Sequence, residues 1–221
     1  EQVTDGAGVS LNRTLGTNRI EHLDPFLLFD EFKNINASQY ISGFPDHPHR
    51  GIETITYMLS GSMHHGDNIG NSGILEKGDV QWMTAGKGII HSEMPEQIDG
   101  LLWGLQLWVN LPSDKKMIKP SYQEVKGPSI PELVKDNGII VKIIAGEVEG
   151  VRGAIAENYS QVSYLDISLP NRTIFNHTIA KDHSVCAFVI DGTVEMGFGS
   201  KIKTIFHGQL GVFGAGEDIQ L

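Results

Sequence analysis

Cysteine is almost absent from this sequence, because its 221 residues contain only Cys186. A single cysteine cannot form an intrachain disulfide, so the sequence does not describe a disulfide-stabilised secreted scaffold, and we expect a reducing, cytoplasmic location. Long hydrophobic runs are also absent. No apolar run approaches the roughly 20 residues that a membrane-spanning helix needs, and no signal-peptide pattern is visible. We therefore expect no membrane partner.

Positive charge is scarce as well. The chain has 17 Lys and Arg against 27 Asp and Glu, which gives a formal net charge of −10. Proteins that bind nucleic acids directly neutralise phosphates with clustered Lys and Arg. The sequence therefore disfavours direct nucleic-acid binding, while it leaves open a role through a protein partner.

Helical patterns are few, and strand patterns dominate. Only "PSIPELVKDNG" (128–138) predicts a helix, with Pro131 in the first turn and Gly138 after the end. The 26 glycines suit short strands joined by tight turns. Alternating segments rich in β-branched and aromatic residues predict strands within 53–61, 79–95, 101–112, 138–148, 162–170, 184–199 and 208–221. We therefore predict an all-β fold with few short helices.

The two halves of the chain resemble each other weakly. "ITYMLSGSM" (55–63) is similar to "AFVIDGTVEM" (187–196), and "EKGDVQWMTAGKG" (76–88) is similar to "FHGQLGVFGAGED" (206–218). Two copies of one β-barrel or sandwich unit would explain the similarity, and a single large sandwich is the alternative. We predict a first domain over 1–112, a linker over 113–130 that is rich in proline, and a second domain over 131–221.

Two short motifs carry the residues best suited to chemistry. His47 and His49 are two positions apart around Pro48, which favours extended backbone, so both imidazoles should lie on one face of a strand. His91 and Glu93 repeat this spacing at the end of another predicted strand. Either pair alone is more simply explained by surface or hydrogen-bonding roles. Together, on adjacent strands, they predict three imidazoles and one carboxylate at a common point.

This ligand set suits a divalent first-row transition metal. Imidazole and carboxylate favour iron, nickel, copper, manganese or zinc over ions that prefer sulfur. Four such ligands around a six-coordinate ion leave two positions for dioxygen, substrate or water. Neutral histidines with one Glu would leave a divalent site with a net charge of +1, which favours an anionic oxygen ligand. The sequence therefore predicts a metal site in the first domain.

Three nearby residues are weaker candidates. Glu53 ranks below Glu93 as a ligand, because we expect its side chain to face away from the histidines unless a bulge intervenes. Its alternative role is a hydrogen bond to Arg50 or to a loop amide. We expect His64 and His65 to be turn residues at the mouth of the barrel, where they could contact substrate.

Three long motifs, in this order, resemble the pirin family of the cupin superfamily: "LDPFLLFDEF" (23–32), "FPDHPHRGIET" (44–54) and "GDVQWMTAGKGIIHSEMP" (78–95). The resemblance implies two tandem cupin domains, which are jelly-roll-like β-barrels, with metal only in the N-terminal one. It also implies that the ligands are His47, His49, His91 and Glu93, whereas the general cupin pattern would use Glu53. Pirin-like chains continue beyond the point that corresponds to residue 221, so we expect the second domain to be degenerate and incomplete.

The same resemblance implies two functions. The first is quercetin 2,3-dioxygenase activity on a small aromatic substrate and dioxygen, with Glu93 as the catalytic base. The cofactor would be one divalent metal, for which the resemblance favours Fe(II) over Zn, Ni, Cu, Mn or Co. The alternative is a non-catalytic, iron-dependent transcriptional co-regulator or redox sensor that acts through a protein partner. A metalloprotein that has lost its activity is a third possibility.

Overall fold

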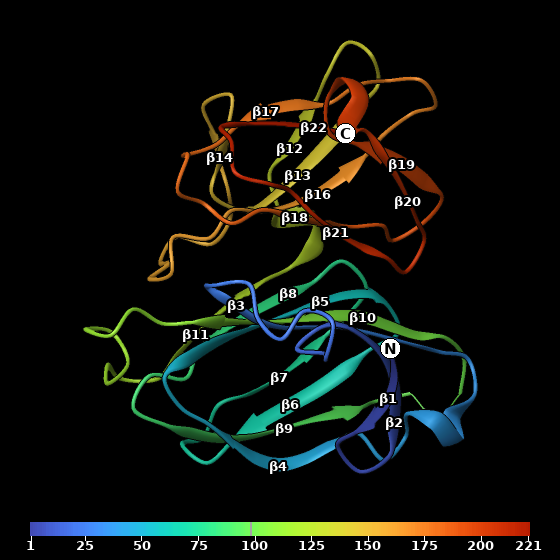
Figure 1. Ribbon diagram of the computed structural model, residues 1–221. Helices are drawn as coiled ribbons and strands as arrows, with labels where there is room; N and C mark the ends of the chain where they lie inside the picture. Colours follow the sequence, from blue (N-terminus) through green and yellow to red (C-terminus); the bar gives the residue numbers. More distant parts are fainter. Residues whose placement is uncertain (98) are drawn as a thin grey trace. The chain divides into compact units, whose positions relative to one another are not determined.

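The computed structural model describes residues 1–97 and 99–221, and it is built almost entirely of β-strands (Figure 1). Helical structure in this described part consists of three 3₁₀ turns, η1 (Ala37–Gln39), η2 (Gly127–Ser129) and η3 (Gly199–Lys201). The predicted all-β fold class is confirmed. None of the described helices is long and apolar enough to cross a membrane.

The predicted helix over 128–138 is wrong. The segment begins with η2, continues into strand β12 (Glu132–Val134), and β12 pairs antiparallel with β13 (Ile140–Ala145). The carbonyl of Pro131 accepts a hydrogen bond from the backbone N–H of Ile143 at 2.9 Å. Pairing with a neighbouring strand thus outweighs the local helical pattern, as tertiary context often does for short segments.

The chain divides into two compact units. The first comprises Glu1–Ile130 together with Ile155–Val162, and the second comprises Pro131–Ala154 together with Ser163–Leu221. The segment 113–130, which we expected to be a linker, contains strand β11 (Ser121–Val125), and β11 pairs along its whole length with β8 (Val80–Thr84). Lys126 and Gly127, just beyond β11, both hydrogen-bond the buried carboxylate of Asp79, so this segment is held firmly to the first unit.

Two antiparallel sheets face each other in the first unit (Figure 1). The larger has the order β1-β2-β3-β10-β5-β8-β11. Besides β8 and β11, it contains β1 (Gln2–Asp5), β2 (Val9–Leu15), β3 (Phe26–Asn34), β5 (Ile52–Ser60) and β10 (Leu102–Asn110). The smaller has the order β4-β9-β6-β7, formed by β4 (Phe44–His49), β9 (Ile89–Pro95), β6 (Met63–Asp67) and β7 (Ser72–Leu75).

An apolar core joins the two sheets at one end of their interior. Its buried members come from both sheets, apart from Tyr40, which follows η1: Val9, Leu11, Phe32, Tyr40, Met58, Met63, Leu75 and Leu102. Gly104 makes this packing possible, because a Cβ atom there would lie 2.3 Å from Cζ of Phe32. The rest of the interior contains several buried polar side chains, and some of them, including His49, His91 and Glu93, belong to the candidate site described below.

The second unit contains one three-stranded sheet, β12-β13-β16, and several two-stranded pairs. Its further strands are β14 (Glu147–Val148), β15 (Val151–Arg152), β16 (Tyr164–Ser168), β17 (Asn176–Thr178), β18 (Cys186–Phe188), β19 (Thr193–Met196), β20 (Lys203–Phe206), β21 (Leu210–Val212) and β22 (Asp218–Gln220). Two clusters of buried residues hold these strands together. One contains Ile139, Val141, Ile143, Val148 and Phe175, and the other contains Val189, Met196 and Ile205.

Candidate metal centre

Strands β4 and β9 bring the three candidate histidines together. His47 lies directly opposite His91 in the antiparallel register of these strands, so both side chains share one face of the sheet. The ring centroid of His47 is 4.5 Å from that of His91 and 4.8 Å from that of His49, and the His49–His91 distance is 5.0 Å. One ligand nitrogen from each ring lies within 4.8 Å of the other two. The predicted convergence of three imidazoles is therefore present.

The local sequence explains this arrangement. Pro45 and Pro48 lack the backbone N–H that a central strand needs, and β4 is accordingly an edge strand of its sheet. Gly51, with a φ of +72°, then allows the sharp turn that carries the chain from β4 into β5 of the other sheet. Nδ1 of His47 donates a hydrogen bond to the carbonyl of Pro45 at 2.8 Å, which leaves Nε2 free to act as a ligand.

Burial keeps the inner histidines neutral. It lowers the pKa of His49 to about 4, and the nearby His91 and His47 add to this effect. Burial likewise lowers the pKa of His91, although Glu93 opposes the change. Among the described residues, neither ring nitrogen of the buried His91 has a hydrogen-bond partner. Unpaired buried nitrogens on neutral imidazoles are what a metal site requires, so the residues fit a divalent ion.

Glu93 lies on the same face of β9 as His91 and is almost fully buried. Its Oε1 accepts a hydrogen bond from the hydroxyl of Thr56 at 2.9 Å, and its Oε2 accepts one from Nε2 of Gln106, also at 2.9 Å. Burial raises the pKa of this carboxyl, but His91 and the two hydrogen bonds outweigh burial and lower it overall. Within the described chain, the set of ligand atoms that converge within 4.8 Å contains the three histidines and not Glu93.

Trp108 and Gln106 form the neighbouring wall. They are two positions apart on β10 and therefore face the same interior. The ring of Trp108 packs edge-on against His49, with ring centroids 4.9 Å apart.

Sequence reasoning did not identify Thr56 or Gln106. The alternation of threonine with apolar residues along β5 was the available signal, since a polar residue that faces a barrel interior needs a partner there.

Glu53 points away from the metal centre. It lies on β5 on the opposite face from Thr54 and Thr56, and Thr56 is the residue that reaches Glu93. Its carboxylate is fully buried and accepts hydrogen bonds from the hydroxyls of Thr84 at 2.8 Å and Ser160 at 2.6 Å. These partners replace the expected ones, Arg50 or a loop amide. Glu53 thus fastens the segment 155–162 to strand β5 within the first unit.

His64 and His65 are not turn residues, so that prediction is wrong. Both lie in strand β6, and the register places His65 opposite Glu93 on one side and Gly73 on the other. The buried His65 ring has its Nε2 atom 2.5 Å from Oε1 of Glu124, on the facing sheet. A Cβ atom on Gly73 would lie 2.6 Å from the same Nε2, so glycine is required for this contact.

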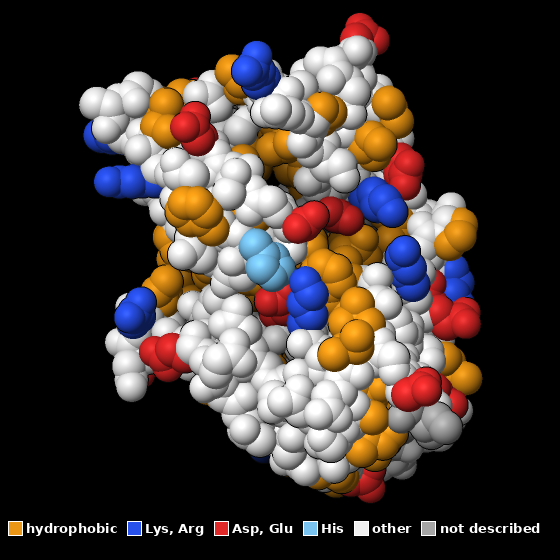
Figure 2. Space-filling view, turned by 90° about the vertical axis from the view of Figure 1, so that its right-hand side faces the viewer, with side chains coloured by type: hydrophobic (Ala, Val, Ile, Leu, Met, Phe, Trp, Pro, Cys, Tyr) orange, Lys and Arg blue, Asp and Glu red, His pale blue; other side chains and the backbone are white. Residues whose placement is uncertain are grey.

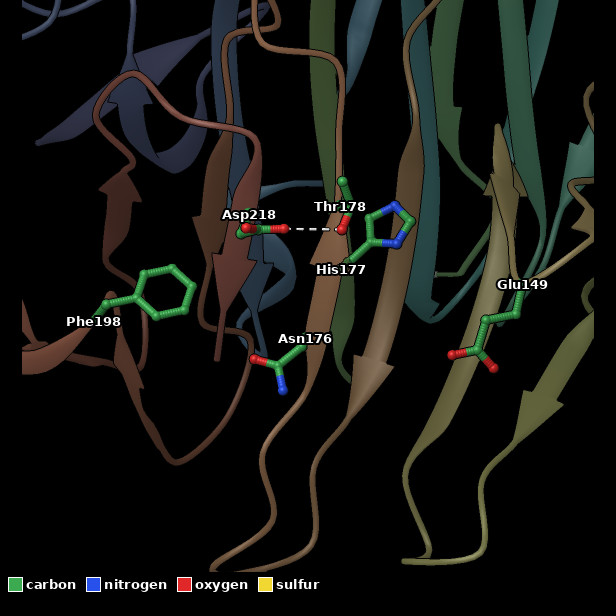
Figure 3. Close-up of a pocket in the computed structure, with 6 residues that line it drawn as sticks. All are labelled: Glu149, Asn176, His177, Thr178, Phe198 and Asp218. Atoms are coloured by element: carbon green, nitrogen blue, oxygen red, sulfur yellow. Dashed lines mark hydrogen bonds between the residues drawn. The ribbon is translucent and has the colours of Figure 1, made fainter.

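A cavity with a volume of about 570 Å³ lies in the second unit. Its lining, drawn in Figure 3, consists of Glu149, Asn176, His177, Thr178, Phe198 and Asp218. The hydroxyl of Thr178 donates to Asp218 at 2.9 Å. Over the part of the chain that the structure describes, the side chains that gather at metal-ligand spacing are those of the first unit.

Comparison with known proteins agrees with this architecture. The pirin family model matches residues 8–109. A pirin-like protein of Caulobacter vibrioides is 49% identical over 197 residues, which cover 89% of this chain and 71% of that protein. The crystal structure of a quercetin 2,3-dioxygenase from Acinetobacter baumannii superposes with a TM-score of 0.88 at 29% identity, covering all of this chain and 78% of the other.

A third comparison is with the Escherichia coli pirin YhhW in complex with nickel(II). It has a TM-score of 0.71 at 18% identity and covers all of this chain and 88% of that one, so it supports the fold alone. These matches confirm the expected architecture of tandem cupin units. From its motifs, its fold and its relatives, the chain belongs to the pirin family.

Proposed function

We propose that the first unit is a metal-dependent dioxygenase domain that opens the heterocyclic ring of a flavonol such as quercetin, or of a similar enol. The convergence of His47, His49 and His91 is the observation that supports this most, because neutral imidazoles beside an ionised carboxylate favour a divalent transition metal. The similarity to the Acinetobacter baumannii quercetin 2,3-dioxygenase supports the choice of substrate. In that reaction class dioxygen is consumed and carbon monoxide is released.

We propose His47, His49, His91 and Glu93 as the ligands of one divalent metal. When bound, the ion would supply Lewis-acid and template chemistry for the substrate oxygens and dioxygen. Fe(II) is the ion that the family resemblance favours. Nickel, which the Escherichia coli relative binds, suits the same donor atoms, as do zinc, copper, manganese and cobalt.

Glu93 is also the proposed catalytic base. Its lowered pKa keeps the carboxylate ionised at neutral pH, so it can accept the proton of the enol hydroxyl. Trp108, which packs against His49, offers a flat aromatic surface for a planar substrate. Because these groups line one interior, proton acceptor and substrate wall would act on the same bound molecule.

The proposed partners are therefore a small aromatic substrate and dioxygen, and the proposed location is the cytoplasm, on the argument of the single cysteine. The formal net charge of −10 disfavours direct nucleic-acid binding, and on the face shown in Figure 2 the Lys and Arg side chains lie scattered among Asp and Glu.

Aerobic incubation of iron-loaded protein with quercetin tests the proposal. We expect loss of the flavonol absorbance with stoichiometric release of carbon monoxide, and neither under anaerobic conditions. His49→Ala should abolish bound metal and turnover together. A fully metallated protein that turns over no flavonol with iron, nickel, copper, manganese, cobalt or zinc would contradict catalysis and favour the alternative function, iron-dependent co-regulation through a protein partner.

A further inference from the structure

A row of polar side chains crosses the interior face of the larger sheet. Gln106 on β10, Thr56 on β5 and Gln81 on β8 are cross-strand neighbours in the antiparallel register. Thr56 and Gln81 are almost fully buried in the middle of this sheet. Polar groups in such positions destabilise a fold unless they are hydrogen-bonded, so their partners indicate what the row does.

The partners of this row lie on the facing sheet and on the edge strand β11. Gln81 donates through Nε2 to Glu124 at 3.1 Å, and Glu124 contacts His65. Thr56 and Gln106 both donate to Glu93, and each takes a different carboxylate oxygen. The row is therefore linked to the facing sheet at two places. One link runs from Gln81 through Glu124 to His65, and the other is the pair of hydrogen bonds to Glu93, the carboxylate of the proposed metal centre.

Two donors on two oxygens fix the orientation of a carboxylate. The oxygens of Glu93 are held from two adjacent strands, so rotation of the carboxylate plane would break at least one hydrogen bond. Each oxygen keeps a second lone pair, which remains available to a cation. Groups that orient a metal ligand in this way raise metal affinity, typically about 10- to 100-fold.

We propose that Thr56 and Gln106 are positioning residues, which hold Glu93 from the opposite sheet in the orientation that a metal beside His91 requires. The inference rests on the proposed function, in that it takes Glu93 as a ligand. It extends that function by assigning the orientation of this ligand to two residues that act through their hydrogen bonds to Glu93. Gln81 and Thr54 are their structural neighbours, and neither has a hydrogen bond to Glu93 among those recorded for the described residues.

The test compares isosteric substitutions with matched controls. Thr56→Val and Gln106→Met remove the donors to Glu93 and nearly preserve volume, whereas Thr54→Val and Gln81→Met make the same chemical changes at neighbouring interior positions. Co(II) serves as the probe, because its visible spectrum reports coordination geometry. Its dissociation constant is measured by competition with a chelator, and thermal unfolding of each metal-free variant reports folding.

We expect Thr56→Val and Gln106→Met each to weaken Co(II) binding about 10- to 100-fold and to shift its visible bands. Thr56→Ser, which keeps the hydroxyl, should restore both properties, and the two control variants should match the parent in Co(II) affinity and visible bands. A parent that binds Co(II) while Thr56→Val and Gln106→Met match their controls would overturn this inference alone. A parent that binds no metal would overturn the proposed function together with it.

Discussion

His47 and His91 face each other across the pairing of β4 with β9, with ring centroids 4.5 Å apart. The register on one side of this pair continues through Pro48 with Ile90 and His49 with Ile89. A shift of β4 by one residue would turn both of its histidines to the opposite face of the sheet. The candidate centre therefore depends on strand register as much as on the identity of its residues.

His91→Ala should abolish metal binding. His91 is buried beside His47 and His49, so its loss removes a ligand and leaves the other two without a third nitrogen. We expect a loss of affinity greater than the roughly 10- to 100-fold that removing an outer partner costs. His64→Ala, one position from the interior-facing His65 on β6, is the matched control. Equal metal content in the two variants, measured by elemental analysis after loading and desalting, would contradict the assignment.

Glu53→Ala should reduce stability and leave metal content unchanged. The substitution leaves the buried hydroxyl of Thr84 without its acceptor, which costs about 1–3 kcal/mol for an unsatisfied buried group, and it leaves the half-buried hydroxyl of Ser160 with only the carbonyl of Asn110. Urea unfolding measures the loss, and Ser160→Ala should reproduce part of it. Loss of metal from a folded Glu53→Ala protein would show instead that Glu53 is a ligand, as in the general cupin pattern.

Gly73→Ala should destabilise the first unit through His65. The new methyl group would meet Nε2 of His65 at 2.6 Å and Oε2 of Glu124 at 3.0 Å, and overpacking of this kind costs about 1–3 kcal/mol. The same substitution in a His65→Ala background should cost less, because the closer of the two contacts is gone. A double-mutant cycle measured by urea unfolding gives this coupling. An equal cost in both backgrounds would rule out the predicted clash.

Cys186 should react slowly with thiol reagents. Burial raises the pKa of its thiol from 9.0 to about 11, and the thiolate is the reactive form. The thiolate fraction at pH 8 should therefore be roughly 100-fold lower in the folded protein than in the unfolded chain, since each pKa unit is a factor of ten. The rate of reaction with a disulfide reagent should rise about tenfold per pH unit towards pH 11. A plateau near pH 9 in the folded protein would contradict the burial effect.

The histidine cluster could be predicted because its information is local. Two motifs with a spacing of two residues, each in strand-forming sequence, fix which side chains share a face, and only the adjacency of β4 and β9 had to be assumed. The supporting contacts are not local in this sense. Thr56 and Glu93 are 37 residues apart and lie in different sheets, so no spacing rule connects them.

The errors have a similar cause. Residues 128–138 have helical end signals, but the pairing of β12 with β13 decides their conformation. His65 has a glycine and an aspartate nearby that suggest a turn, yet pairing with β7 and β9 draws it into a strand. Strand β11, SYQEV, has little apolar character, and its strand conformation comes from pairing with the edge of β8.

The most direct test of the central claim is anomalous diffraction at the absorption edge of the metal, on crystals of protein loaded with one transition metal. We predict a single strong peak in the first unit, about 2.1 Å from one nitrogen each of His47, His49 and His91, with a carboxylate oxygen of Glu93 completing the protein ligands. A peak elsewhere in the chain, or loaded crystals in which the three imidazoles surround no peak, would contradict the account.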